Sequence, residues 1–148
     1  MKKFVFKFSP AVWILLTVIS ALFAAAVVLN IYDAISYANE IGAKFFFALI
    51  VATISATLLT LIIAAIIYSR YVVRGNYLYF YFGFLYTKTD INEIFQLTHF
   101  KAQKKLVMYF NNEKYSVALI DEKRYEEFYN ALKAVNPDII FTVQSPEE

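Results

Sequence analysis

The segment from Phe45 to Tyr68, FFFALIVATISATLLTLIIAAIIY, constrains this chain more than any other feature, because it holds no charged residue and no proline. A helix rises about 1.5 Å per residue, so this run is long enough to cross the roughly 30 Å hydrocarbon core of a bilayer with some tilt. We therefore assign residues 45–69 to a transmembrane helix. The chain is thereby divided into a membrane part and a water-facing part that follows it.

A second apolar run, from Ala11 to Tyr32, precedes this helix. Ser9 followed by Pro10 is typical of a helix start, because serine caps free N–H groups and proline suits the first helical position. A basic start before an apolar run is also the pattern of a signal peptide, but this run is too long for such a leader. We predict an uncleaved span over residues 11–32, with a basic arm over residues 1–10 and a connecting loop over residues 33–44.

The distribution of basic residues predicts how the hairpin is oriented. The lysines near the N-terminus, together with Arg70 and Arg74 after the second span, outnumber Lys44, the only base of the connecting loop. Basic residues favour the cytoplasmic side of a membrane. We therefore expect a multi-pass protein of the cell membrane, with both termini in the cytoplasm and residues 33–44 outside.

Composition excludes several functional classes. The chain has no cysteine and a single histidine, so thiolate or multi-histidine metal sites are ruled out, and we expect no cofactor. Its 14 basic and 12 acidic side chains give a net charge of only +2, which argues against a nucleic-acid partner. The expected partners are the lipid bilayer and either another membrane protein or a second copy of the chain.

The hydroxyl groups of the second span allow two interpretations. Thr53, Ser55, Thr57 and Thr60 add polarity, which would suit a packed oligomer or a polar pathway. The same hydroxyls can instead bond back to carbonyls of their own helix. Transport and proton-relay sites usually need an ionisable residue inside the membrane, and neither span carries one at its centre. We therefore interpret the spans as anchors.

Beyond Arg70 the hydrophobic period changes to two. Tyr77 to Phe82 alternates tyrosine with leucine or phenylalanine, as a half-buried strand should, and Gly75-Asn76 supplies a turn before it. Similar patterns, with a hairpin turn at Asn111-Asn112-Glu113, predict further strands at Tyr71–Arg74, Phe84–Lys88, Ile94–Thr98, Leu106–Phe110 and Tyr115–Ile120.

The period then becomes helical. Asp121 is a candidate N-cap, and one helical face carries Tyr125, Phe128, Tyr129, Leu132 and Val135. Asn136-Pro137 should end this helix, and Ile139 to Val143 suggests a last extended segment. We expect a folded domain over residues 70–143 and a polar tail over residues 144–148.

These elements resemble a known group. Two spans, then YVVRGNYLYFYFG, DINEIFQL, KKLVMYF and YSVALIDEKRYEEFYNALKAVNP, are similar to the YyaB-like bacterial PH (pleckstrin homology-like) domain family. The resemblance covers Tyr71 to Pro137 and the paired spans. It implies an α+β membrane protein: a two-helix transmembrane hairpin followed by a PH-like antiparallel β-barrel or sheet, which a C-terminal helix caps.

The resemblance also implies a membrane-associated protein that is not an enzyme, and it supplies no catalytic residues. PH domains that bind phosphoinositides use a basic cluster in the first hairpin loop. Here that loop is Gly75-Asn76, with Arg74 as the only adjacent base, so we do not expect inositol lipid binding.

Two groups of residues are candidate contact sites. His99, Lys101, Lys104 and Lys105 lie in and near a predicted loop, where they would meet anionic headgroups or an acidic partner; an ordinary solvated loop is the alternative. Tyr77, Tyr79 and Tyr81 share one face of a strand, which is either a docking face or packed against the rest of the domain or the membrane-proximal segment.

The sequence therefore predicts a membrane-anchored, non-enzymatic interaction module that binds protein or lipid at the cytoplasmic membrane face. It contains no glycine-rich phosphate loop, no metal-ligand spacing and no nucleophile–base pattern. The alternatives are a bacteriocin-immunity or envelope-stress membrane protein and an accessory subunit of a transporter or channel.

Overall fold

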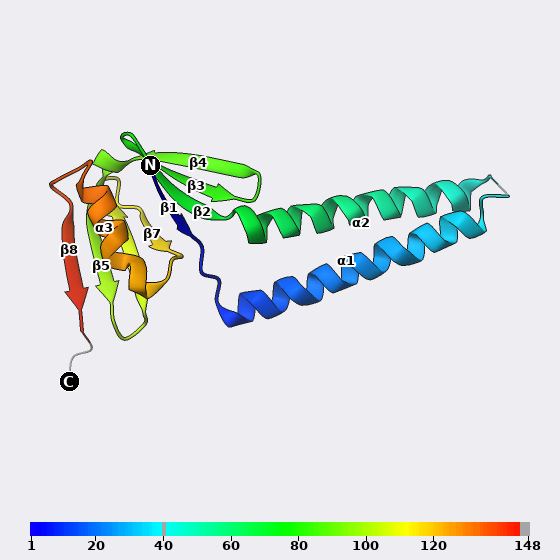
Figure 1. The fold of residues 1–148 in the computed structure, drawn as a ribbon, viewed down its shortest axis with the longest axis horizontal. Helices are drawn as coiled ribbons and strands as arrows, with labels where there is room; N and C mark the ends of the chain where they lie inside the picture. Colours follow the sequence, from blue (N-terminus) through cyan, green and yellow to red (C-terminus); the bar gives the residue numbers. More distant parts are fainter. Residues whose placement is uncertain (40, 146–148) are drawn as a thin grey trace. The chain divides into compact units, whose positions relative to one another are not determined.

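The computed structural model describes residues 1–39 and 41–145, and these residues fall into two compact units. One unit is the segment from Ser9 to Ile67, and the other joins Met1–Phe8 to the chain from Tyr68 onward. The described part of the chain is α+β: two long apolar helices form a hairpin, followed by two four-stranded sheets and a C-terminal helix, as predicted (Figure 1).

The hairpin consists of α1 (Pro10–Ser36) and α2 (Ala43–Tyr68), each long and apolar enough to span a membrane. Ser9 caps α1 as expected, because its hydroxyl accepts a hydrogen bond from the Val12 N–H at 3.3 Å. The helix runs past the predicted boundary at residue 32, since the residues up to Ser36 contain no proline or glycine to stop it.

Polar side chains of α2 bond within the helix. The hydroxyls of Thr53, Thr57 and Thr60 each donate to the carbonyl four residues earlier, at 2.8 Å. Within the described part of α2, the buried residues are small ones: Ala48, Ala52, Ser55, Ala64 and Ala65. These hydroxyl protons therefore bond to carbonyls of their own helix, which is the second of the two interpretations given above.

The remaining unit is built on two sheets. Sheet A has the strand order β1 (Lys2–Val5), β2 (Arg70–Arg74), β3 (Tyr77–Phe82) and β4 (Leu85–Asp90), and each neighbouring pair is antiparallel. Sheet B has the order β7 (Tyr115–Ala118), β6 (Lys105–Phe110), β5 (Ile94–Phe100) and β8 (Ile140–Gln144). The β5–β8 pair is parallel, whereas the other pairs of sheet B are antiparallel.

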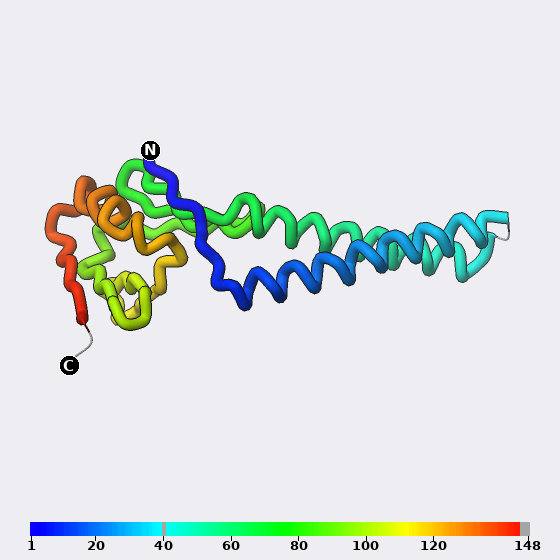
Figure 2. The backbone as a smooth tube through the Cα atoms, turned by 60° about the horizontal axis from the view of Figure 1, so that its bottom comes forward, coloured from blue at the N-terminus to red at the C-terminus, as the bar shows by residue number. Residues whose placement is uncertain are grey.

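The N-terminal arm is part of this unit, whereas we had expected a separate basic segment. Strand β1 pairs with β2 in the register Lys2↔Val73 to Val5↔Arg70, and the arm lies along the domain (Figure 2). The side chain of Phe4 is fully buried, with its ring 5.0 Å from that of Phe128. Burial of this aromatic ring explains why the arm joins the fold, because apolar area removed from water is the main stabilising term.

The arm continues beyond β1 and reaches the segment that follows β7. The Phe6 N–H donates to the Ser69 carbonyl at 3.1 Å, and the Lys7 N–H donates to the Leu119 carbonyl at 2.8 Å. The Lys7 ammonium also pairs with the Asp121 carboxylate at 2.7 Å. The segment that precedes α1 therefore connects sheet A to the segment that follows β7 in the same domain.

The C-terminal helix, α3 (Tyr125–Lys133), covers the core. Tyr125, Phe128 and Leu132 of its predicted apolar face are buried, together with Ala131. Asp121 caps a short 3-10 helix at Glu122–Arg124, rather than α3 itself, by accepting the Lys123 N–H. A buried cluster that includes Phe4, Tyr71, Leu78, Leu97, Met108 and Phe128 unites β1, both sheets and α3.

Candidate interaction surface

The tyrosines of β3 share one face of sheet A, on which Tyr77 is exposed and Tyr79 and Tyr81 are half-buried. Tyr77, Tyr79 and Tyr81 alternate with the core residues Leu78 and Phe80, because successive side chains of a strand point to opposite sides. Neighbouring ring centroids along β3 lie 6.4 and 6.3 Å apart. These tyrosines are not members of the buried core cluster, and Tyr79 and Tyr81 are half-buried.

A fourth tyrosine and two cations complete this face. Tyr86 of β4 is paired with Tyr81, and their ring centroids are 5.7 Å apart. The Arg70 guanidinium lies 5.6 Å from the Tyr81 ring, and the Lys88 ammonium lies 4.8 Å from the Tyr77 ring. Both distances suit cation–π contact.

We call Tyr77, Tyr79, Tyr81 and Tyr86 the tyrosine face. It offers flat apolar rings with hydroxyl groups at their tips, next to positive charge. Tyrosine is enriched at interfaces for this combination, and guanidinium groups bind carboxylates and phosphates well. The tyrosine face can therefore bind a partner that combines apolar surface with negative charge.

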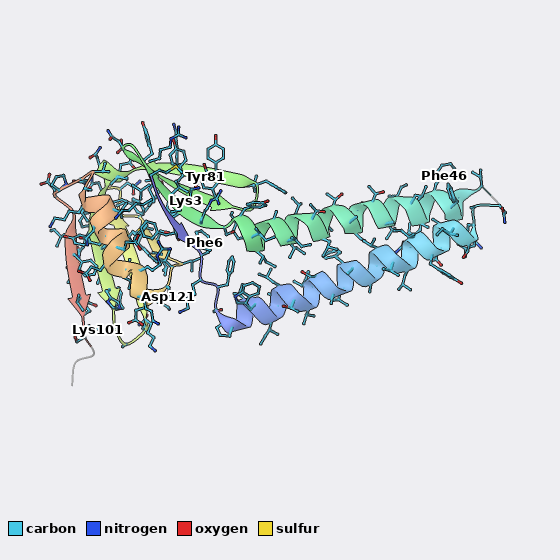
Figure 3. All side chains as sticks on the ribbon, viewed as in Figure 1. Lys3, Phe6, Phe46, Tyr81, Lys101 and Asp121 are labelled. Carbon is cyan, nitrogen blue, oxygen red and sulfur yellow. The ribbon has the colours of Figure 1, made fainter. Side chains whose placement is uncertain are left out.

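Three of the predicted loop residues occupy another part of the domain. Lys101, Lys104 and Lys105 are exposed at the β5–β6 turn, and Figure 3 places Lys101 far from Tyr81. The turn is fixed by its backbone, because the Lys101 N–H donates to the Gln144 carbonyl at 3.0 Å and the Tyr125 O–H donates to the Lys104 carbonyl at 2.8 Å. The lysines and the tyrosine face are thus separate surfaces.

His99 is largely buried, unlike the exposed lysines with which the sequence groups it. Its side chain is only 13% exposed, and its ring packs edge-on against that of Tyr125, 4.9 Å between centroids. The Nε2 atom lies 3.4 Å from Glu122 Oε1, yet it makes no hydrogen bond to any described residue. His99 therefore contacts the helical side of sheet B, whereas the lysines face outward.

Tyrosines with perturbed acidity serve structural contacts. Burial raises the pKa of Tyr71 to about 12, and its phenol oxygen accepts the Leu119 N–H at 3.1 Å. Burial is also the main cause that raises the pKa of Tyr125, with the carboxylates of Glu122 and Asp121 adding to it.

Two carboxylates shift in the opposite direction. A hydrogen bond from Lys7 lowers the pKa of Asp121, and a hydrogen bond from Arg124 lowers the pKa of Glu127. Each carboxylate belongs to an ion pair on the domain surface, Asp121 with Lys7 and Glu127 with Arg124. Within residues 1–39 and 41–145, no group of three or more His, Asp or Glu side chains lies close enough to hold a metal ion.

The evidence for function comes from the surfaces of the domain. No protein-family model, curated protein or solved structure matches this chain. Sequence reasoning found three members of the tyrosine face but missed Tyr86, Arg70 and Lys88. The strand register that brings these residues together was the missing signal.

Proposed function

We propose that this chain is a membrane-anchored, non-enzymatic interaction module whose β domain works at the cytoplasmic face of the cell membrane. In this proposal α1 and α2 cross the bilayer, and the domain is PH-like, as the resemblance to the YyaB-like family implies. The order of strands β2 to β7 followed by one amphipathic helix, α3, supports a PH-like domain, and β8 is an additional strand after that helix.

The pairing of β1 with β2 is the observation that carries the proposal. Strand β1 ends at Val5 and α1 begins at Pro10, while α2 ends at Tyr68 and β2 begins at Arg70. Both ends of the helical hairpin are therefore tied to the same sheet by short connections. A hairpin that crosses the membrane twice would then hold this domain directly at the surface from which both ends emerge.

Charge supports the cytoplasmic side. Bases flank both ends of the hairpin that join the domain, at Lys2, Lys3, Lys7, Arg70 and Arg74, against Lys44 at the other end. Basic residues next to spans favour the cytoplasm. A cysteine introduced at Ser36 should react with an impermeant thiol reagent in intact cells, and one at Ser145 should not; the reverse reactivity would refute this orientation.

The tyrosine face is the proposed binding surface. Tyr77 and Tyr86 are exposed, Tyr79 and Tyr81 are half-buried, and the face carries adjacent positive charge. The groups with shifted pKa values, in contrast, are engaged in contacts that hold the fold together. A shifted pKa points to catalysis when the group lies in a cleft beside an acid or base with which it can exchange a proton, and these groups serve structural contacts instead. Binding without chemistry is therefore the function that these residues support best.

The test is crosslinking and affinity capture of the full-length protein from its own membranes. A variant with Tyr79→Ser and Tyr86→Ser should lose a partner that the wild type retains. Tyr115→Ser is the matched control, because Tyr115 is an exposed tyrosine of β7 in sheet B. Loss of the partner in the control as well, or its loss only when Lys101, Lys104 and Lys105 are changed to alanine, would contradict the assignment.

A further inference from the structure

The tip of the β3–β4 hairpin is apolar, which is unusual for a turn. Strand β3 ends at Phe82 and β4 begins at Leu85, so Gly83 and Phe84 form the turn, with Gly83 at φ +60°. Phe84 is 63% exposed and Leu85 is 76% exposed. Turns are normally built from small or polar residues, because they face water.

The other hairpin turns of the described chain follow that rule. The β2–β3 turn is Gly75-Asn76, the β5–β6 turn carries Lys101 and Lys104, and the β6–β7 turn carries Asn111 and Asn112. Of these hairpin turns, the β3–β4 turn is the one that carries large exposed apolar side chains. We call Phe82, Gly83, Phe84 and Leu85 the apolar tip.

The strand register places the apolar tip at one particular end of sheet A. Strand β2 starts at Arg70, which is paired with Tyr81, and Phe82 is the next residue of β3. The apolar tip therefore lies at the end of the sheet where the chain arrives from α2. The Tyr68 and Phe84 ring centroids are 6.1 Å apart, so the tip is in contact with the last residue of α2.

The residues beside the apolar tip have the chemistry of a membrane interface. Tyr81 and Tyr86 flank it, and aromatic rings with a polar atom favour the headgroup layer. Arg70 lies over the Tyr81 ring and adds a positive charge at the same end of the sheet. Near an anionic leaflet such a charge is attracted to the lipid headgroups.

We propose that the apolar tip inserts into the interfacial layer of the same bilayer that α1 and α2 cross, with Arg70 at the anionic headgroups. This inference rests on the proposed spanning role of the two helices. Tyr68 ends the apolar run of α2 and therefore lies where a spanning helix would leave the hydrocarbon core, so a side chain in contact with it reaches the same depth.

Insertion has a mechanical consequence for the domain. The chain connections at residues 6–9 and 68–70 join the domain to the helices, and the apolar tip adds a contact with lipid that is independent of them. The orientation of sheet A relative to the bilayer then becomes fixed. The tyrosine face begins at Tyr81 and Tyr86, next to the apolar tip, and continues along β3 to Tyr77.

The chain contains no cysteine, so single-cysteine variants carry one fluorescent label each. The full-length protein is labelled at Phe84→Cys or Leu85→Cys in the apolar tip, at Asn112→Cys in the polar β6–β7 turn, and at Ile54→Cys within α2. Each is reconstituted into vesicles of phosphatidylcholine with a minor share of phosphatidylglycerol. Quenching is measured with nitroxides near the headgroups, with nitroxides deep in the acyl chains and with aqueous iodide.

The labels at positions 84 and 85 should be quenched several-fold more by the shallow lipid nitroxide than the label at position 112, and less by iodide. Quenching of the two tip labels equal to that at position 112 would overturn the proposal. Shielding from both lipid and aqueous quenchers would also overturn it, and would indicate a protein partner or a second copy on the tip. Absence of deep quenching at position 54 would instead refute the spanning role of the helices.

Discussion

Removing the ring of Phe4 should destabilise the domain, although this residue lies before the first helix of the hairpin. Its side chain is fully buried, packs edge-on against Phe128 at 5.0 Å and lies under the Arg124 guanidinium at 4.7 Å. An aromatic side chain that buries about 150–200 Å² contributes about 4–5 kcal/mol at about 25 cal/mol per Å². Replacements of core phenylalanine by alanine cost about 3–5 kcal/mol, which agrees.

The assay is amide hydrogen exchange of the full-length protein in detergent micelles, followed in β2 and β3. A domain of this kind has a total free energy of unfolding of about 5–15 kcal/mol, so Phe4→Ala removes a large share of it. Because about 1.4 kcal/mol corresponds to a tenfold change, a loss of about 3 kcal/mol should speed exchange at least about 100-fold.

Val5→Ala provides the matched control. Val5 belongs to the same strand but is 58% exposed, so its truncation should change the free energy of unfolding by no more than about 0.5 kcal/mol. Equal exchange rates in β2 and β3 for Phe4→Ala, Val5→Ala and the wild type would show that β1 is not part of the folded domain.

Two further predictions concern ionisable groups of the domain. Asp121→Asn should lower the thermal stability at neutral pH. The hydrogen bond from Lys7 lowers the pKa of Asp121 in the folded protein below its ordinary value of 3.8. The carboxylate therefore stabilises the fold above pH 3.8, and this stabilisation is lost as the pH falls through the pKa of the folded state. Unfolding temperatures measured across a pH series should therefore converge for variant and wild type in strong acid, and a constant difference would contradict this. Tyr71→Phe should cost about 0.5–1.5 kcal/mol at neutral pH, because the part-buried hydrogen bond from the Leu119 N–H to the phenol oxygen is lost. Because the pKa of Tyr71 is raised from 10.0 to about 12, its protonated form stabilises the wild type below pH 10, and this stabilisation is lost as the pH rises toward 12. Chemical denaturation across this pH range should show the loss in the wild type and not in the phenylalanine variant.

Local sequence patterns were sufficient for most elements. Long uncharged runs predicted both helices, and strict alternation predicted β3 together with the face shared by its tyrosines. The hairpin at Asn111–Glu113 was also predicted from its turn residues. These features depend on near neighbours in the chain, which is why a single sequence reveals them.

The role of the N-terminal arm depended on a distant partner. Lys3 to Phe8 alternates, with phenylalanine at positions 4, 6 and 8, which is the pattern of a half-buried strand. Four residues of strand carry no indication of which strand they pair with, and β2 lies beyond the entire helical hairpin. The basic residues of this segment therefore predict an arm, although the structure forms a strand there.

The candidate site was predictable in part. Tyr77, Tyr79 and Tyr81 were predicted as one face, but the contribution of Tyr86 follows from the β3–β4 register. His99 was grouped with nearby lysines because they are adjacent in sequence. Its actual neighbour is the ring of Tyr125 on α3, a contact that arises only after the helix packs on sheet B.

The segment before the first helix is a strand of the domain that follows the second, and a designed disulfide tests this pairing most directly. Lys3 and Val72 are directly paired, and paired residues of antiparallel strands have Cα atoms about 4.5–5.5 Å apart, which permits a disulfide. Lys3→Cys with Val72→Cys should form an intramolecular disulfide under mild oxidation in native membranes. The two parts of the chain should then stay linked after proteolysis between the helices, until a reductant is added. Lys3→Cys with Lys101→Cys, two distant positions in Figure 3, should not crosslink. Failure of the first pair to crosslink, or equal crosslinking of both pairs, would contradict this account.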